Sequence, residues 1–237
     1  MTTEPRLFVE ASLHAGASFA LVPAQAHYLG TVLRRGAGDR VLLFNGRDGE
    51  WHARLTELRR ERATVAVDAV LRPQAEEETD VWLAFALLKR DATDLVVQKA
   101  TELGATALLP VLTARTNAGR VNEARLAAIA IEATEQSERL TVPRIHPPQP
   151  LATLLDAWPA DRRLFAALER VPDAAPLRPF HGKAGLLIGP EGGFAPVELD
   201  ALRNHPLVTV VTLGPRILRA ETACLAGLTL LQAPGSG

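Results

Sequence analysis

The hydrophobic pattern of the chain changes near residue 73, and this change limits the possible folds more than any other feature. Residues 1–72 contain short apolar runs separated by glycine-containing turns. The stretch 73–78 then holds a proline and three successive acids, which is typical of a solvated linker. Beyond it, apolar strands alternate with amphipathic helices. The sequence therefore predicts two domains, at residues 1–72 and 73–237.

The first domain has the pattern of a small β-barrel. The apolar run Arg40–Phe44 precedes Asn45-Gly46, which is a strong hairpin signal. Residues 63–70 alternate between apolar and polar, as a half-buried strand requires. One helix is expected around residues 24–33. Several short strands joined by glycine turns favour a barrel over a helical fold.

The second domain has the pattern of an α/β fold. Nearly continuous apolar runs indicate strands that are buried on both faces, and helices at 3.6-residue spacing separate them. This alternation predicts a mostly parallel sheet with helices on both sides. The expected strands are residues 81–88, 107–111, 164–167, 185–188 and 208–213, and the expected helices are 94–103, 123–136, 196–203 and 221–231.

Composition excludes several classes of protein. The single cysteine, Cys224, rules out a disulfide framework and a cysteine-based zinc cluster, and the six histidines never fall at metal-ligand spacing. No metal is therefore expected. No apolar run approaches the roughly 18 residues of a membrane span, and the first residues do not form a signal peptide, so a cytoplasmic protein is expected. The net charge of −1 argues against a polycation that coats nucleic acid, although most basic residues are arginines.

Two glycine-proline junctions are the candidate functional site. Residues 188–194 (IGPEGGF) follow one apolar strand, and residues 213–223 (LGPRILRAETA) connect the last strand to the last helix. Ligands of parallel sheets bind at the carboxyl ends of strands, and glycine lets the backbone approach a ligand closely. Two such junctions predict two walls of one pocket. The alternative interpretation is a pair of tight turns that bind nothing.

Common catalytic fingerprints are absent from the chain. It has no G-x-G-x-x-G of a dinucleotide-binding fold, no P-loop and no G-x-S-x-G nucleophile elbow. Cys224 lies within an apolar helical stretch and is expected to be a small buried hydrophobe.

The two junctions closely resemble the signature motifs of the bacterial small-subunit ribosomal RNA uridine-N3 methyltransferases, which belong to the SPOUT superfamily. The resemblance extends over nearly the whole chain. Its other blocks are residues 27–29 with 32–34, 44–46, 98–104 (QKATELG), 115–117 and 133–137.

This resemblance implies a specific architecture and activity. The second domain would be a trefoil-knotted SPOUT methyltransferase domain that holds S-adenosyl-L-methionine, and the first would be a PUA-like RNA-binding barrel. The enzyme would be a homodimer. Its substrate would be one uridine in the decoding region of small-subunit (16S) ribosomal RNA, within an assembled or nearly assembled 30S particle. The alternatives are a knotted methyltransferase for transfer RNA or a ribose 2′-OH, and a non-catalytic RNA-binding assembly factor.

Site residues are assigned on the same basis. Arg219 is expected to stabilise negative charge on the uracil ring, and Glu221 either accepts the N3 proton or favours the dipole of the last helix. The expected cofactor-binding residues are Leu168, Ile188, Gly189, Pro190, Gly192, Gly193, Leu213, Gly214, Pro215, Ile217 and Leu218. The expected RNA contacts are Arg6, Arg34, Arg35, Arg115, Asn117 and Gln136.

Overall fold

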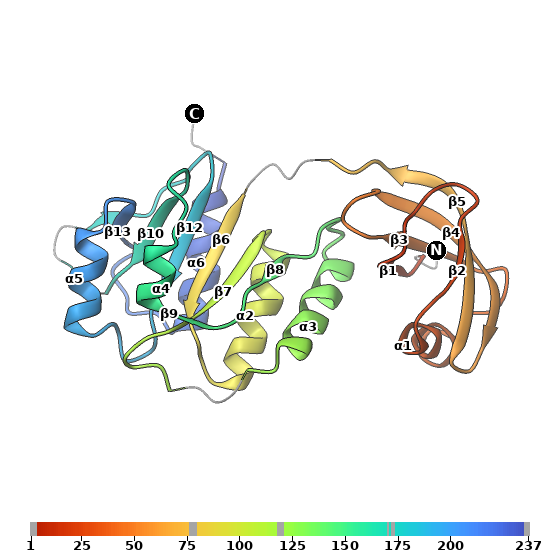
Figure 1. The fold of residues 1–237 in the computed structure, drawn as a ribbon, viewed down its shortest axis with the longest axis horizontal. Helices are drawn as coiled ribbons and strands as arrows, with labels where there is room; N and C mark the ends of the chain where they lie inside the picture. The colour runs from red at the N-terminus through yellow and green to blue at the C-terminus, as the bar shows by residue number, and fades with distance from the viewer. Residues whose placement is uncertain (1–3, 76–79, 118–120, 170, 172–173, 235–237) are drawn as a thin grey trace. The chain divides into compact units, whose positions relative to one another are not determined.

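The computed structural model describes residues 4–75, 80–117, 121–169, 171 and 174–234. The chain forms two compact units (Figure 1). The first consists of residues 1–76 together with 134–142, and the second of residues 77–133 together with 143–237. The segment 134–142, which the sequence places in the C-terminal domain, thus packs with the N-terminal unit.

The first unit is built on one five-stranded sheet with the order β1-β3-β4-β5-β2. In this sheet β1 pairs parallel with β3, whereas the pairs β3–β4, β4–β5 and β5–β2 are antiparallel. Ala26 and Leu29, from the helical segment of residues 23–32, are fully buried in its core beside Val41, Leu43 and Val65. The elements are β1 (Arg6–Phe8), β2 (Ser18–Ala20), α1 (Pro23–His27), the π-helical turn η1 (Tyr28–Val32), β3 (Arg40–Phe44), β4 (Glu50–Arg59) and β5 (Arg62–Arg72).

The predicted hairpin is confirmed, and side-chain chemistry explains it. The Oδ1 atom of Asn45 accepts hydrogen bonds from the backbone N–H groups of Arg47 (3.0 Å) and Asp48 (2.9 Å). Gly46 and Gly49 have φ values of +75° and +83°, a region that glycine occupies at little steric cost. The loop therefore reverses the chain between β3 and β4, which pair antiparallel.

The segment 134–142 is held in the first unit by arginine side chains. Arg6 donates from Nη1 to the carbonyl oxygens of Thr134 (3.0 Å) and Glu135 (2.7 Å), and from Nη2 to that of Arg139 (2.8 Å). Arg72 donates to the carbonyl of Glu138 (2.9 Å). Because helix α3 (Glu123–Gln136) ends in this segment, Arg6 satisfies carbonyls that a helix end leaves without intrahelical partners.

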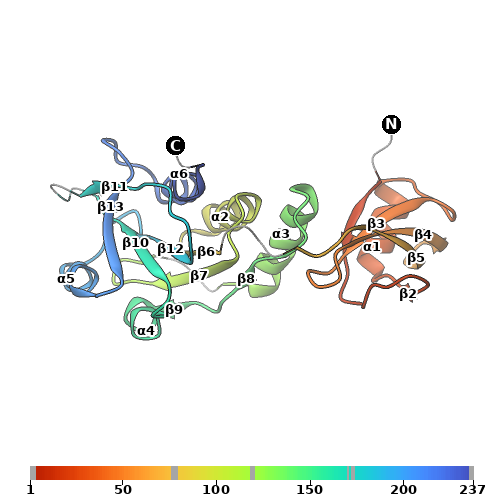
Figure 2. The same ribbon diagram turned by 90° about the horizontal axis from the view of Figure 1, so that it is seen from above.

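The second unit is a parallel sheet with the order β11-β13-β10-β12-β6-β7-β8, and β9 also pairs with β7. Helices α2 and α6 lie on one face, and α4 and α5 lie on the other (Figure 2). The predicted α/β class is confirmed. The strands are β6 (Val81–Ala86), β7 (Ala107–Leu112), β8 (Arg144–Ile145), β9 (Gln149–Pro150), β10 (Arg163–Ala167), β11 (Ala175–Pro176), β12 (Ala184–Ile188) and β13 (Val208–Thr212), and the helices, besides α3, are α2 (Arg90–Glu102), α4 (Leu151–Asp156), α5 (Pro196–Asn204) and α6 (Ala220–Gln232).

The sheet of the second unit buries its strands as the apolar runs require. Strand β12 lies between β10 and β6, and every one of its residues is buried. Cys224 on α6 is fully buried, and this burial raises the pKa of its thiol, so the residue behaves as a small hydrophobe. None of the helices in the described part of the chain is long and apolar enough to cross a membrane.

Candidate active site

A cavity of about 680 Å³ opens at the carboxyl ends of β10, β12 and β13. Both glycine-proline junctions contribute to its wall, so the prediction that they form one pocket is confirmed. Its size falls within the range of pockets that enclose small organic ligands, roughly 300–1,000 Å³. Each residue that the sequence assigns to the cofactor lines it: Leu168, Ile188, Gly189, Pro190, Gly192, Gly193, Leu213, Gly214, Pro215, Ile217 and Leu218.

The first junction forms a tight turn in which side chains lie against Gly189 and Gly192, while Gly193 stays uncovered. The N–H of Gly193 donates to the carbonyl of Pro190 at 2.8 Å, and Gly193 has a φ of +68°. A Cβ atom at Gly189 would lie 2.7 Å from the Phe194 ring, so that ring packs directly on the glycine. Arg115 Nη1 donates to the carbonyl of Gly192 at 2.7 Å, which holds the turn from outside.

The second junction is shaped by Thr212 and Gly214. The N–H of Gly214 donates to Oγ1 of Thr212 at 3.2 Å, and its φ of +118° strongly favours glycine. No atom lies within 4 Å of a Cβ built at Gly193 or Gly214. Both junctions therefore present bare backbone to open space, as close approach of a ligand requires.

The two candidate catalytic residues lie next to the cavity and outside its wall. Arg219 is the N-cap residue of α6 and is exposed, whereas its neighbours Leu218 and Ala220 line the cavity. Among the described residues, its guanidinium makes no hydrogen bond or ion pair with another side chain. Glu221 lies in the first turn of α6 and is half-buried. A carboxylate at this position favours the helix dipole.

The expected RNA contacts lie in both units. Arg34 is exposed and Arg35 is half-buried in the first unit, and Gln136 is exposed in the segment 134–142 of that same unit. Arg115 and Asn117 are exposed in the second unit. Arg115 contacts the wall of the cavity through Gly192, which places it at the active-site mouth.

Arg6 does not fit the predicted role of an RNA contact. Its side chain is only 9% exposed, and Nε donates to Glu50 Oε1 at 2.6 Å. Its other nitrogens bond to the carbonyls of the segment 134–142, and the guanidinium lies 4.5 Å above the Phe44 ring. The side chain is thus enclosed by protein, so we remove Arg6 from the RNA-binding set.

The cavity wall also contains residues that the sequence interpretation missed. Glu169 and Val171 follow strand β10, and a search of every strand end could have found them. Leu199 on α5 left no local signal, because only the packing of that helix brings it to the cavity. The other missed residues are Ala167, Glu191, Phe194, Thr212, Arg216, Ala220 and Ala223.

No group of three or more His, Cys, Asp or Glu side chains within the described ranges is placed to hold a metal ion.

Comparisons with known proteins agree with this geometry. Residues 75–232 match the family model of an RNA methyltransferase domain, and residues 23–68 match that of an RNA methyltransferase PUA domain. A relative from Rickettsia conorii named ribosomal RNA small subunit methyltransferase E is 32% identical, covering 98% of this chain and 96% of its own. The chain belongs to this RNA methyltransferase family.

Further relatives in the methyltransferase family span the same length. The Bacillus subtilis protein of the same name is 28% identical over 95% of each chain. The solved Neisseria gonorrhoeae methyltransferase E, bound to S-adenosylmethionine, is 31% identical with a TM-score of 0.85 and 96% coverage of both chains. A Legionella pneumophila protein solved with the same cofactor is 28% identical, with a TM-score of 0.87 and 99% coverage of both. The match of residues 23–68 to the PUA domain model identifies the first unit as PUA-like.

Proposed function

We propose that the chain methylates N3 of one uridine in the decoding region of 16S ribosomal RNA, using S-adenosyl-L-methionine. The observation that carries the proposal is the single cavity lined by both glycine-proline junctions, in a chain that belongs to an RNA methyltransferase family. We propose residues 73–237 as a trefoil-knotted SPOUT domain and residues 1–72 as the RNA-binding barrel, acting as a cytoplasmic homodimer on an assembled or nearly assembled 30S particle.

The residues of the cavity fit the proposed cofactor. Bare backbone at Gly193 and Gly214 leaves room for a nucleoside, and the apolar side chains of Leu168, Leu213 and Leu218 suit an adenine ring. Two relatives of this size and fold are solved with S-adenosylmethionine bound. When bound, the cofactor supplies an electrophilic methyl group. Such a donor needs no metal.

The chain's own residues must handle the charge on the uracil ring. N3 of uridine carries a proton and is a weak nucleophile until that proton leaves. We propose that Arg219 stabilises the resulting anion through its exposed guanidinium, as oxyanion donors do. Glu221 either accepts the proton or only favours the helix dipole, and its half-buried position on α6 suits both roles.

RNA recognition is proposed to use polar residues of both units, namely the exposed Arg34, Arg115, Asn117 and Gln136 and the half-buried Arg35. Arginine contacts to phosphate orient RNA without reading its sequence. The N3 edge of a uridine is normally paired or stacked, so the target base must be unpaired or turned out of its stack. Specificity for one uridine is therefore expected to come from the folded shape of the particle.

A deletion strain provides the test. Mass spectrometry of digested 16S ribosomal RNA is expected to show the loss of 3-methyluridine at one site, and a plasmid copy of the gene should restore it. Persistence of the modification in the deletion strain would refute the uridine-N3 assignment. Calorimetry with S-adenosylmethionine separates an enzyme from a non-catalytic assembly factor, since the factor would show no heat of binding at millimolar cofactor.

A further inference from the structure

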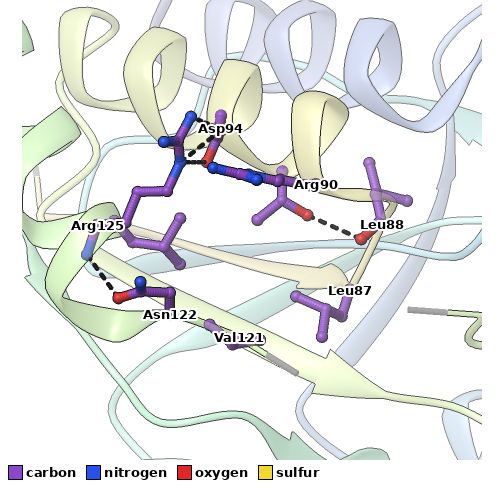
Figure 3. A pocket seen from close by; sticks show the side chains of 9 residues that line it. Leu87, Leu88, Arg90, Asp94, Val121, Asn122 and Arg125 are labelled. Atoms are coloured by element: carbon purple, nitrogen blue, oxygen red, sulfur yellow. Dashed lines mark hydrogen bonds and ion pairs between the residues drawn. The ribbon is translucent and has the colours of Figure 1, made fainter. Parts of the chain in front are cut away.

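A second cavity, of about 260 Å³, lies between the start of α2 and the start of α3 (Figure 3). We name it the α2–α3 cavity. Leu87 and Leu126, which are 4% and 3% exposed, form part of its apolar floor, and Arg90, Asp94, Asn122 and Arg125 form its polar rim. The volume is below that of pockets for whole cofactors, and suits a single base.

The α2–α3 cavity opens at the same edge of the sheet as the proposed active site. Strands β6 and β12 are parallel neighbours, and Phe85 on β6 is paired with Ile188 on β12. Leu87 lies two residues after Phe85, and Pro190 lies two residues after Ile188, so both come just past the carboxyl ends of these strands. Neighbouring strands are about 4.8 Å apart. A chain of nucleotides entering the active site could therefore reach both cavities.

Arg125 presents a fixed, planar guanidinium at the rim. Its Nε lies 2.9 Å and its Nη2 2.6 Å from Oδ2 of Asp94, and Nε also lies 3.2 Å from Oδ1 (Figure 3). Two donors on one carboxylate fix the orientation of the guanidinium plane. Unpaired RNA bases stack on the flat faces of arginine guanidinium groups as well as on aromatic rings.

The rim also offers hydrogen-bond donors that have no partner within the described residues. Arg90 is exposed and its guanidinium has no ion pair there, so it can contact a phosphate. Asn122 uses its Oδ1 to accept from the backbone N–H of Arg125 at 3.1 Å, which leaves its amide nitrogen available to a base edge. The apolar floor and the flat guanidinium suit a base, and the separate polar donors suit a base edge and a phosphate, so together they complement one nucleotide.

We propose that the α2–α3 cavity binds an unpaired nucleotide of the RNA substrate close to the methylated one, with its base against Arg125 and its phosphate on Arg90. This inference rests on the proposed function, because it supplies a second contact for the same RNA. It also gives Arg90 and Arg125 a role in substrate specificity that is separate from the chemistry at Arg219.

The test measures methylation of small-subunit particles from a deletion strain by three variants. Arg90→Ala removes the phosphate contact, Arg125→Lys keeps the charge but loses the planar group, and Arg163→Ala is the control. Arg163 is exposed at the amino end of β10, at the opposite edge of the sheet. Thermal unfolding of each variant checks that it is folded.

We expect Arg125→Lys to raise KM for the particle about five- to tenfold, as loss of a stacked base does. Arg90→Ala should raise it about threefold or more and lower the slope of log KM against log salt by about one. The kcat at saturating particle, the affinity for S-adenosylmethionine and the Arg163→Ala control should stay unchanged.

Two results would overturn the inference while leaving the proposed function intact. In the first, both variants match Arg163→Ala in KM. In the second, they weaken S-adenosylmethionine binding or lower kcat, so that the cavity only supports the active site. If Arg125→Lys is unfolded, Arg90→Ala alone decides, because Arg90 has no partner in the described fold to lose. Failure of the wild-type protein itself to methylate the particle would instead refute the proposed function.

Discussion

The arginines around Glu50 in the first unit and those of the loop 213–219 in the second unit have opposite surroundings. Arg6 is enclosed by protein and Arg72 shares its carboxylate partner, Glu50, which is 2% exposed. Arg216 and Arg219 are exposed, and no interaction of their side chains is found in the described part of the chain. The first pair stabilises a fold, whereas the second pair remains available for a ligand. Arginine alone therefore does not predict an RNA contact; the occupancy of its donors does.

Replacing Arg6 should have the largest effect on stability. Arg6→Ala leaves the buried Glu50 with one partner and leaves carbonyls of the segment 134–142 without donors. Breaking a buried pair in this way costs about 3–5 kcal/mol. Urea unfolding would measure the loss, with Arg34→Ala as an exposed control that should change little. Equal stabilities of the two variants would show that the enclosed Arg6 stabilises the fold no more than an exposed arginine does.

Replacing Arg219 should lower activity and leave stability unchanged. Arg219→Ala is expected to lower kcat at least about 100-fold, as loss of one oxyanion donor does. Its free energy of unfolding and its affinity for S-adenosylmethionine should remain close to wild type, because the side chain has no partner in the described structure. Arg216→Ala, in the cavity wall, is the matched comparison. Unchanged turnover in Arg219→Ala would show that another residue stabilises the anion.

Acidification should remove the stability that the buried carboxylate of Glu50 contributes to the fold. Burial alone would raise the pKa of Glu50, but hydrogen bonds from Arg72 and Arg6 outweigh it and lower the pKa below 4.5. The folded state thus binds this proton less readily than the unfolded state. The stabilisation is present above about pH 4.5 and is lost as the pH falls through the folded-state pKa.

Unfolding of the wild type and Glu50→Gln across pH 3–7 tests this dependence. The variant should be less stable at neutral pH and should lose less stability on acidification. Parallel curves for the two proteins would show that Glu50 does not titrate differently in the folded state.

Arg115 is intermediate between the two groups, and its replacement should have a small effect on stability. It is exposed, yet it donates one hydrogen bond to the carbonyl of Gly192. Arg115→Ala should therefore cost about 1 kcal/mol or less in stability, which is typical of a single hydrogen bond. Calorimetry with S-adenosylmethionine would show whether this bond also orders the 189–193 turn. A loss of stability as large as that of Arg6→Ala would contradict the view that exposed arginines stabilise the fold less than enclosed ones.

The sequence predicted the main elements because local patterns determine them. Asn45-Gly46 forms its hairpin through contacts within four residues, and helix α3 begins and ends where its periodicity predicted. The two-residue strands β8, β9 and β11 have no such pattern, since tertiary contacts alone define them. The membership of segment 134–142 in the first unit also has no sequence signal, because its bonds to Arg6 use backbone carbonyls, which every residue possesses.

The candidate site was predictable for a similar reason. Glycines directly after buried strands mark backbone at the carboxyl edge of the sheet, and this located both junctions correctly. Side chains that arrive through packing, such as Leu199, could not be found in this way. The assignment of Arg6 failed because a buried arginine and an exposed one are identical in sequence.

A crystal structure of the chain grown with S-adenosylmethionine would show whether both glycine-proline junctions hold the cofactor. We predict that the cofactor lies between residues 188–193 and 213–218, with main-chain atoms of both turns within hydrogen-bond distance. A cofactor bound elsewhere, or crystals that take up none at millimolar concentration, would contradict it.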